Sequence, residues 1–240
     1  MDAIYTAWQA TIAGYMGVPF VQQVATPLAC APAYGVRVAY QVDSPTPCDD
    51  FYIANCDPNA AVAALKSVTP IANQYITVLD DRLDCVATYT ALGLHHAYSE
   101  VLMACDVRQR IRTAPAYDVH RATRADVQEW NALDPEEVTW LHPLNVFVQN
   151  MGHYAVFIDG QLVARGRSLR MASGDSYVSM IYTAPAYRRR GIATALMQHI
   201  LNEDYDVGVQ VSVLLAAQSA VALYQKVGYQ ALATTHVFTP

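Results

Sequence analysis

Clustered positive charge is missing from most of this 240-residue sequence. Charged residues make up 15% of the chain, the formal net charge is −6, and basic residues concentrate only at Arg188, Arg189 and Arg190. A protein that binds nucleic acid along a broad face needs a basic patch or stripe. We therefore expect no nucleic-acid partner.

Long apolar runs are also missing. No segment of about 18 consecutive apolar residues occurs, which is the length that a membrane-spanning helix needs. The apolar opening, residues 1–17, carries an acid at Asp2 and lacks the basic region of a signal peptide. Hydrophobic residues still make up 53% of the chain, which excludes a disordered chain. We expect a cytoplasmic protein with a packed core and no membrane partner.

Cysteine is absent from the second half of the chain, which excludes a cysteine nucleophile there. The cysteines are odd in number, form no C-x-x-C pair, and are Cys30, Cys48, Cys56, Cys85 and Cys105. Neither a disulfide framework nor a zinc site has this pattern, and no histidine pair offers metal-ligand spacing. We expect buried thiols and no metal site.

The pattern of the chain changes near residues 108–116, which are polar, basic and closed by a proline. This composition is typical of a linker. Because domains run to roughly 100 to 200 residues, the length allows two modest ones. We predict a smaller α/β lobe at residues 1–112 and a second domain at residues 113–240.

The second domain is expected to alternate strands and helices. Asp159-Gly160 is a strong hairpin signal between two extended runs, and Thr123 with Asp126 resembles a capping box. The elements predicted are strand 117–123, helices 124–133 and 135–150, strands 154–160, 161–172 and 175–184, helix 191–201, strand 207–215, helix 217–227 and strand 229–239. This order predicts a mixed α/β sheet layered by helices.

One pattern occurs twice in the chain. Residues 86–94 and 221–229 both read V-A-x-Y-x-x-aliphatic-G-apolar, and both precede a strand-like run. A helical run at residues 60–75 and strand-like runs at 36–42 and 51–56 precede the first copy. Helix, glycine and strand recur by chance in α/β proteins because glycine caps helices. We nevertheless favour a duplication that relates the two lobes.

The segment 179–197 carries the clearest chemical signal. A strand runs into a proline-broken turn, and an arginine-rich loop with a glycine then opens a helix. Such a junction leaves unpaired amides at the positive end of a helix dipole, and small residues at Gly191 and Ala193 let phosphates approach the backbone. The junction therefore predicts a pyrophosphate site. The alternative is an ordinary basic turn that is exposed to solvent and binds no ligand.

Two motifs in this half resemble the GNAT superfamily of acyl-CoA-dependent N-acetyltransferases. The signature Q/R-x-x-G-x-G/A is met by residues 188–193, RRRGIA, after P-x-Y at 185–187, and L-Y-x-K-x-G-F/Y is met by residues 223–229. The resemblance covers residues 117–240. It implies a GNAT-like, mixed, mostly antiparallel twisted sheet with flanking helices. The first lobe lacks the signature and would be a degenerate GNAT-like lobe.

The resemblance also implies roles for individual residues. Acetyl-CoA would be the co-substrate, and a primary amine of a small molecule or peptide would attack it directly. Tyr224 would protonate the leaving thiolate, the alternative being a tyrosine that only packs its helix. The cofactor-binding residues implied are Ile181, Tyr182, Thr183, Arg188, Arg189, Arg190, Gly191, Ile192, Ala193, Thr194, Ser219 and Tyr224.

Two positions depart from the family's pattern. Ala217 stands where many members carry asparagine, which leaves Ser219 as the nearest polar substitute. The strand before the turn has no carboxylate to serve as base. Asp175, Glu137, His153, a water relay or an amine that is already neutral stay open as alternatives.

The remaining expectations concern the acceptor and the rival functions. By the family's architecture Trp130, Trp140 and residues 133–150 would cover the acceptor pocket, although ordinary helix packing explains them equally well. A non-catalytic acyl-CoA sensor is one alternative function. A pseudo-enzyme whose first lobe recruits a partner is another.

Overall fold

The computed structural model describes most of the chain, and the described residues form two compact units. The described ranges are 2–16, 26–27, 36–39, 48–54, 56–67, 73–80, 82–109, 111, 116–133 and 150–240. Unit 1 comprises residues 1–19, 103–215 and 219–231, and unit 2 comprises residues 20–102, 216–218 and 232–240. The boundary predicted from the sequence falls after residue 112, whereas each compact unit takes residues from several parts of the chain.

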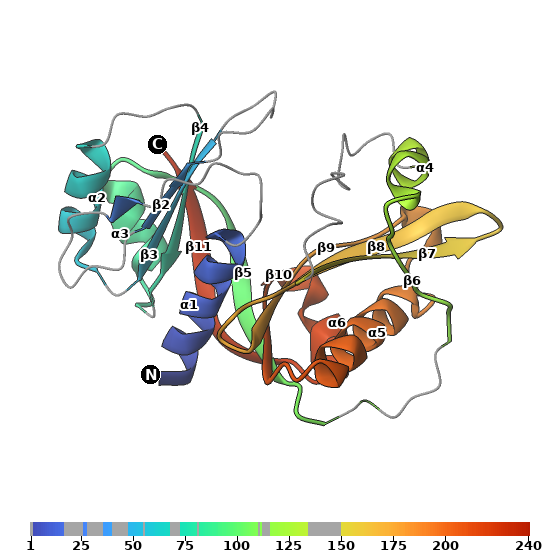
Figure 1. Ribbon diagram of the computed structural model, residues 1–240. Coiled ribbons are helices and arrows are strands. Elements are labelled where there is room, and N and C mark those ends of the chain that lie inside the picture. The colour runs from blue at the N-terminus through green and yellow to red at the C-terminus, as the bar shows by residue number, and fades with distance from the viewer. Residues whose placement is uncertain are drawn as a thin grey trace. The chain divides into compact units, whose positions relative to one another are not determined.

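Unit 1 is a sheet with helices on both faces. Its elements are α1 (Asp2–Met16), β6 (His120–Arg121), α4 (Asp126–Leu133), β7 (Met151–Ile158), β8 (Gln161–Arg170), β9 (Asp175–Thr183), the 3-10 turn η2 (Pro185–Tyr187), α5 (Ile192–Asp206), β10 (Val211–Ala217), the 3-10 turn η3 (Gln218–Ala220) and α6 (Val221–Lys226). The strand order is β10-β9-β8-β7-β6, antiparallel except for the β9–β10 pair. Figure 1 shows α4 and α5 on opposite faces of β7, β8 and β9.

Local sequence signals account for several of these elements. Asp159 and Gly160 both adopt positive φ, 51° and 75°, which a two-residue turn needs to match the twist of the flanking strands. The backbone amide and hydroxyl of Thr123 both donate to the Asp126 carboxylate at 2.6 Å, so the capping interaction is confirmed. The apolar side of α5 is buried against the sheet, with Ile192 1% exposed.

Some expected elements differ from those observed. The strand expected at 117–123 is only the two residues of β6, and α1 was not assigned from the sequence at all. The helix expected at 60–75 ends at Lys66, and a strand begins at Asn73. Pro70 lies between them in the sequence, and proline cannot donate the amide that a continuing helix requires. The helix expected at 135–150 lies almost wholly outside the described residues.

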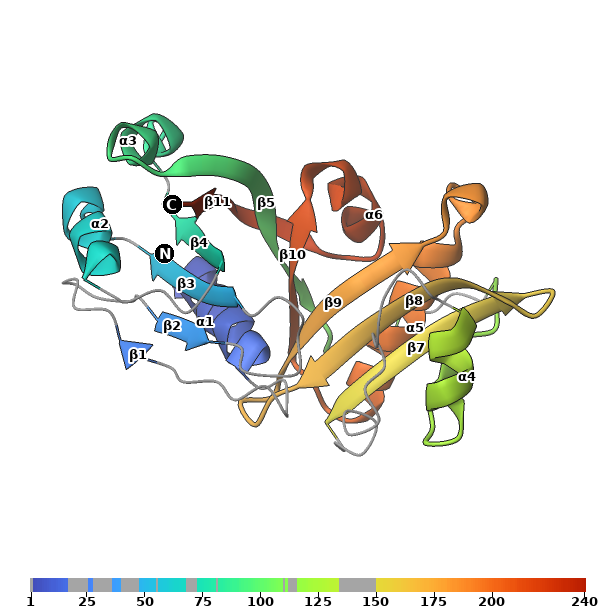
Figure 2. The ribbon, with the colours of Figure 1, turned by 90° about the horizontal axis from the view of Figure 1, so that it is seen from above.

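Unit 2 is a smaller sheet with two helices. Its elements are β1 (Thr26–Pro27), β2 (Val36–Ala39), β3 (Cys48–Ala54), α2 (Pro58–Lys66), β4 (Asn73–Leu79) and α3 (Cys85–Ala91), together with most of β5 (His95–Asp106) and β11 (Gln230–Thr239). The strand order is β1-β2-β3-β4-β11-β5, with β3 and β4 parallel (Figure 2). The mixed α/β architecture with flanking helices that the sequence predicts is confirmed.

Buried apolar side chains hold unit 2 together. Phe51, Ile76, Tyr89 and Phe238 are at most 1% exposed and belong to one core cluster. Burying side chains of this size contributes roughly 1.5 to 3 kcal/mol each. The cysteines whose burial the structure describes, Cys56, Cys85 and Cys105, are buried, as expected. Within the described ranges, no helix is both long and apolar enough to cross a membrane.

The repeated V-A-x-Y pattern takes the same local structure twice. α3 and α6 are each followed by a glycine in the left-handed region, Gly93 at φ 97° and Gly228 at φ 105°. The amide of the next residue donates to the carbonyl of Tyr89 at 3.2 Å in the first copy and of Tyr224 at 3.0 Å in the second. Both copies therefore end their helix with the same glycine cap before a long strand.

Candidate functional site

The strands β9 and β10 separate along their length. They pair in parallel only over Asp175–Tyr177 and Val211–Val213, although β9 continues to Thr183 and β10 to Ala217. On its other side β9 stays paired with β8 as far as Thr183. This separation leaves backbone donors and acceptors on one edge of β9, to which an extended ligand can hydrogen-bond.

A bulge shapes β9 just before its end. The register with β8 shifts so that Ser179 faces Arg167 and Tyr182 faces Arg165, and Met180 adopts a φ of 56°. The shift brings Ile181 over Gly166. A Cβ on this glycine would overlap the Cδ1 atom of Ile181 and touch two side chains of α5. Glycine is therefore what lets Ile181 pack beneath α5 while the strand bends.

The helix that follows β9 begins without a side-chain cap. Gly191 is the N-cap residue, with a φ of 83°, and as a glycine it has no side chain to cap the first amides of α5. The first backbone bond of the helix runs from the amide of Ala195 to the carbonyl of Gly191 at 3.0 Å. The amides of Ile192, Ala193 and Thr194 have no partner inside the helix, and they lie at the positive end of its dipole. This is the geometry of an anion site.

One cavity of about 530 Å³ joins the end of β9, the start of α5 and α6. Its lining residues are Ile181, Tyr182, Thr183, Tyr187, Arg188, Arg189, Gly191, Ile192, Ala193, Thr194, Ser219, Ala220, Leu223 and Tyr224. Every cofactor residue expected from the sequence lines it except Arg190. The lining residues that sequence reasoning missed are Tyr187, Ala220 and Leu223. Two of these, Tyr187 and Leu223, belong to the two motifs that resemble the GNAT superfamily. Their place in those motifs could have identified them from the sequence.

The loop arginines divide between the cavity and the loop itself. Arg188 and Arg189 line the cavity, and the Nε atom of Arg188 donates to the carbonyl of Thr183 at 3.0 Å. This bond ties the loop back to the end of β9. Arg189 adopts a φ of 61° and is exposed. Of the three loop arginines, Arg189 therefore has the fewest existing bonds to break when its guanidinium binds an incoming anion.

Arg190 has a different place from the one expected. Its guanidinium donates to the carbonyl of Ala186 at 3.0 Å and lies 5.1 Å from the centroid of the Tyr187 ring. Its own carbonyl accepts a hydrogen bond from the Tyr117 hydroxyl at 2.9 Å. The side chain therefore stabilises the turn at residues 185–187 rather than lining the cavity. Sequence reasoning could not separate the three arginines because they are adjacent and chemically identical.

Tyr224 brings a hydroxyl-bearing ring to the same cavity. It lies on α6, is 7% exposed, and packs edge-to-face against Tyr229 with ring centroids 5.8 Å apart. Ser219, in η3, also lines the cavity, whereas Ala217 at the end of β10 does not. The polar substitute predicted for the missing asparagine is therefore in the cavity wall.

The residues considered as the general base lie in different parts of the structure. His153 is 2% exposed, and burial together with the charges of Arg167 and Arg121 lowers its pKa to about 3. Asp175 opens β9 and accepts a hydrogen bond from the Ser173 hydroxyl at 2.8 Å. It stands six to eight residues from the cavity end of the strand, about 20 Å or more. Glu137 and Trp140 fall outside the described residues.

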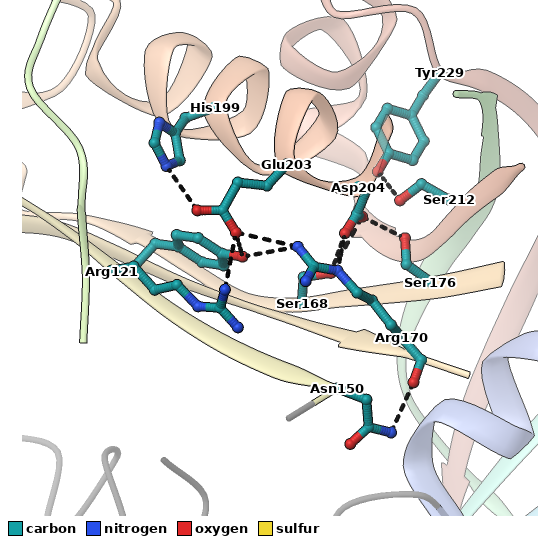
Figure 3. Close-up of polar contacts among 11 residues, drawn as sticks. Arg121, Asn150, Ser168, Arg170, Ser176, His199, Glu203, Asp204, Ser212 and Tyr229 are labelled. Carbon is teal, nitrogen blue, oxygen red and sulfur yellow. Dashed lines mark hydrogen bonds and ion pairs between the residues drawn. The ribbon is translucent and has the colours of Figure 1, made fainter. Parts of the chain in front are cut away.

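A buried polar cluster fastens the far half of α5 to the sheet (Figure 3). Asp204 is fully buried and accepts hydrogen bonds from Ser176 at 2.6 Å, Ser168 at 3.2 Å and the Nε atom of Arg170 at 2.8 Å. Because a buried carboxylate needs several donors, these bonds tie α5 to both β8 and β9. The signal in the sequence was an acid on the apolar face of the helix.

The neighbouring acid, Glu203, is held by a second set of groups. It accepts hydrogen bonds from the Tyr154 hydroxyl at 2.9 Å and from Arg170 at 3.1 Å, and His199 lies 3.3 Å away. The bonds from His199 and Tyr154, with nearby arginine charge, lower its pKa to about 2. The carboxylate is therefore charged at neutral pH, and this cluster is structural rather than part of the cavity.

Comparison with known proteins identifies the domain that contains the cavity. The model of the acetyltransferase (GNAT) family matches residues 112–229. No curated protein matches the chain. Among solved structures, a GCN5-related N-acetyltransferase from Kribbella flavida has a TM-score of 0.69 at 17% identity, covering 99% of this chain and 95% of that one.

Two further structures share the fold. An acetyltransferase of the GNAT family from Novosphingobium aromaticivorans has a TM-score of 0.57 at 18% identity and covers 97% of this chain and 95% of its own. A GCN5-related N-acetyltransferase from Sphaerobacter thermophilus has a TM-score of 0.55 at 13% identity, with 87% and 76% covered. At such identities the likeness shows the fold alone. By its family match and the two motifs, the domain at residues 112–229 belongs to the GNAT acetyltransferase family.

Proposed function

We propose that this protein is an N-acetyltransferase that transfers the acetyl group of acetyl-CoA to a primary amine of a small molecule or peptide. One observation carries the proposal. A single cavity is lined together by the splayed end of β9, the uncapped start of α5 and Tyr224. These are the three parts that a thioester with a pyrophosphate tail requires, and membership of the GNAT family supports acyl transfer.

The residues present fit acetyl-CoA. The free amides of Ile192, Ala193 and Thr194 would hold the pyrophosphate, with Arg189 adding positive charge. A Cβ built on Gly191 would meet nothing within 4 Å, so the backbone is open to a close approach there. The edge of residues 181–183 that faces away from β8 would bind the pantetheine amides. When bound, acetyl-CoA supplies an acetyl group activated as a thioester.

The chain's own groups would then serve each step of the transfer. The amine nitrogen attacks the thioester carbonyl and forms the new C–N bond, while an amide of β9 stabilises the oxyanion. The C–S bond breaks, and the Tyr224 hydroxyl gives its proton to the departing sulfur. The amine enters neutral, or first gives a proton to water. After the attack its nitrogen releases one further proton, and water returns a proton to the Tyr224 phenolate. With a pKa of about 3, His153 is too weak a base to take that proton at neutral pH.

Two further features belong to the proposal. We propose that unit 2 is a degenerate GNAT-like lobe that arose by duplication. The parallel β–α–β unit in each half and the matching glycine caps after α3 and α6 support this. We also propose that the protein works in the cytoplasm.

Two measurements test the function. Isothermal titration of the purified full chain with acetyl-CoA should give one saturable site, and Gly191→Glu should abolish it because the new side chain blocks the pyrophosphate loop. Thiol release in the presence of a broad amine panel should then identify acceptors. Absence of heat at high micromolar acetyl-CoA would contradict the proposal.

One observation favours the rival function of a non-catalytic acyl-CoA sensor. Among the residues that the structure describes, none that lines the cavity is a carboxylate or a histidine, so this part of the lining provides no strong base. A sensor would bind acetyl-CoA with the same heat yet release no thiol with any amine. Tyr224→Phe would leave its binding unchanged.

A further inference from the structure

A pair of tyrosines connects the cavity to β10. Tyr224 forms part of the cavity wall, and its ring meets that of Tyr229 edge-to-face at an interplanar angle of 67°. Tyr229 is 2% exposed and does not line the cavity. Its hydroxyl lies 2.7 Å from the Oγ atom of Ser212, which is fully buried on β10 (Figure 3).

The position of Tyr229 is set at three points. Its amide donates to the carbonyl of Tyr224 at 3.0 Å, across the turn at Gly228. Its ring packs on Tyr224, and its hydroxyl bonds to Ser212. Ser212 in turn pairs with Ser176 of β9, inside the short stretch where β9 and β10 are still joined. Through Tyr229, the cavity tyrosine is therefore tied to the closed end of the splayed strands.

We infer that Tyr229 is a positioning residue for the acetyl transfer, and that its hydrogen bond to Ser212 fixes the Tyr224 hydroxyl where the departing sulfur will lie. The inference rests on the proposed function, in which Tyr224 is the general acid. A general acid works only within hydrogen-bond reach of the atom that it protonates, and small misplacements are costly. An edge-to-face ring contact has a preferred geometry, so the ring of Tyr229 transmits its own position to Tyr224.

Two features of Tyr229 fit a positioning role: it lies away from the reacting atoms, and its hydroxyl keeps its proton. It is absent from the cavity wall, so it cannot touch the reacting atoms. Burial also holds the pKa of its phenol well above the ordinary value, so the group stays protonated and keeps its bond to Ser212 over the working pH range.

Tyr229→Phe tests the inference because it keeps the ring and removes only the hydroxyl. With the most active amine of the panel, we expect kcat to fall about tenfold while the KM for acetyl-CoA is unchanged. Tyr224→Phe should lower kcat further. In the Tyr224→Phe background, adding Tyr229→Phe should cost nothing more, because the group that it positions has already gone.

Matched serine variants separate positioning from plain stability. Ser212→Ala removes the other half of the bond and should reproduce the fall in kcat seen with Tyr229→Phe. Ser168→Ala is the control: it removes a buried hydroxyl of β8 that bonds to Asp204, and it should leave kcat unchanged. Thermal unfolding of all variants reports any common loss of stability, which would affect Ser168→Ala as much as Ser212→Ala.

The outcomes distinguish the inference from the proposed function. Wild-type kcat in Tyr229→Phe, or an additive loss in the double variant, overturns the positioning role alone. Full activity of Tyr224→Phe overturns the general-acid role and the positioning role with it. If the wild-type protein releases no thiol with any amine, the acetyltransferase function itself fails.

Discussion

Two β–α–β units with parallel strands occur among the described residues, and their helices begin in opposite ways. In unit 2, α2 follows β3, and the carboxylate of Asp57 accepts a hydrogen bond from the amide of Ala60 at 2.9 Å, with Pro58 in the first turn. In unit 1, α5 follows β9, and its N-cap residue is Gly191 with no side-chain bond. An acid already occupies the amides of α2, whereas those of α5 are open.

This difference shows what makes an anion site. Both units supply a helix start after a parallel strand, so topology alone does not decide the matter. A carboxylate at the start of α2 satisfies an amide and repels a second anion. At the start of α5, the glycine leaves the amides uncapped, and the arginines attract an anion. This difference supports our proposal that the junction before α5, rather than the one before α2, holds the pyrophosphate.

The two tyrosines of the repeated pattern differ in the same sense. Tyr89 is fully buried in the core of unit 2, 5.3 Å from the Phe238 ring, and its hydroxyl finds no hydrogen-bond partner among the described residues. Burial and the nearby Asp80 raise the pKa of its phenol far above the ordinary value. Tyr224 instead faces the cavity. The same local pattern thus gives a core residue in one unit and a candidate catalytic residue in the other.

The largest expected effect is at the open helix start. Gly191→Glu should weaken acetyl-CoA binding about 1,000-fold, because it removes several charge-assisted bonds and places a like charge beside the pyrophosphate. Titration calorimetry measures the change. Gly93→Glu in unit 2 is the matched control, since Gly93 also has a positive φ and open space around it. It should lose some stability and no affinity, and equal losses at both glycines would break the comparison.

The next effect separates the two tyrosines. Tyr224→Phe should lower kcat about 100-fold, a typical contribution of a general acid. Tyr89→Phe should leave kcat unchanged and should leave the free energy of unfolding equal or slightly higher, because it removes a buried hydroxyl without a hydrogen bond. Steady-state kinetics and denaturant unfolding measure these quantities. A loss of activity in Tyr89→Phe would contradict the view that Tyr89 is a core residue without a role in catalysis.

A third effect concerns the pH dependence of stability in unit 1. The pKa of His153 is about 3 in the folded protein against an ordinary value of 6.5. Below pH 6.5 the unfolded chain therefore takes up a proton that the folded chain does not. The free energy of unfolding should fall by about 2 kcal/mol between pH 7.5 and pH 5 from this group alone.

His153→Gln should flatten that slope in denaturant unfolding across the same pH range. Glu203 does not contribute there, because its pKa is lowered from 4.5 to about 2 and its stabilisation is lost only below pH 4.5. His236→Gln in unit 2 serves as the control. That histidine is only half-buried, so its variant should change the slope less. An unchanged slope in His153→Gln would contradict the expectation.

The smallest effect is at the capped helix start of unit 2. Asp57→Ala should lower the free energy of unfolding by about 1 kcal/mol, the usual cost of losing an N-cap. It should change neither the affinity for acetyl-CoA nor the stoichiometry of one, because α2 lacks the arginines and the open glycine. A second binding event in calorimetry would show that the cap alone keeps anions away.

Features set by a few adjacent residues were readable from the sequence. The hairpin at Asp159-Gly160 needs two residues that tolerate positive φ, and the pair supplies them. The loop at residues 188–194 and the helix that follows it are likewise local, and nearly all the residues predicted there to bind the cofactor line one cavity. The end of the helix after Lys66 was missed, because an alanine-rich pattern outweighed the proline beyond it.

Features that join distant residues were not readable. Asp204 bonds to Ser176 and Ser168, 28 and 36 positions away, and no periodicity in the sequence points from one to another. The hydrogen bond of Arg190 to its own loop was equally hidden, because a rotamer decides it rather than a residue type. The same holds for the link from Tyr224 through Tyr229 to Ser212.

The order of residues alone determined where the chain turns, where its helices can start, and which stretch can receive an anion, because these depend on φ preferences, caps and charge over a few neighbours. The folded chain decided which of two similar tyrosines reaches a cavity and which strands separate. Those outcomes depend on side chains brought together from far along the chain, where burial and partners settle the free energy of each group.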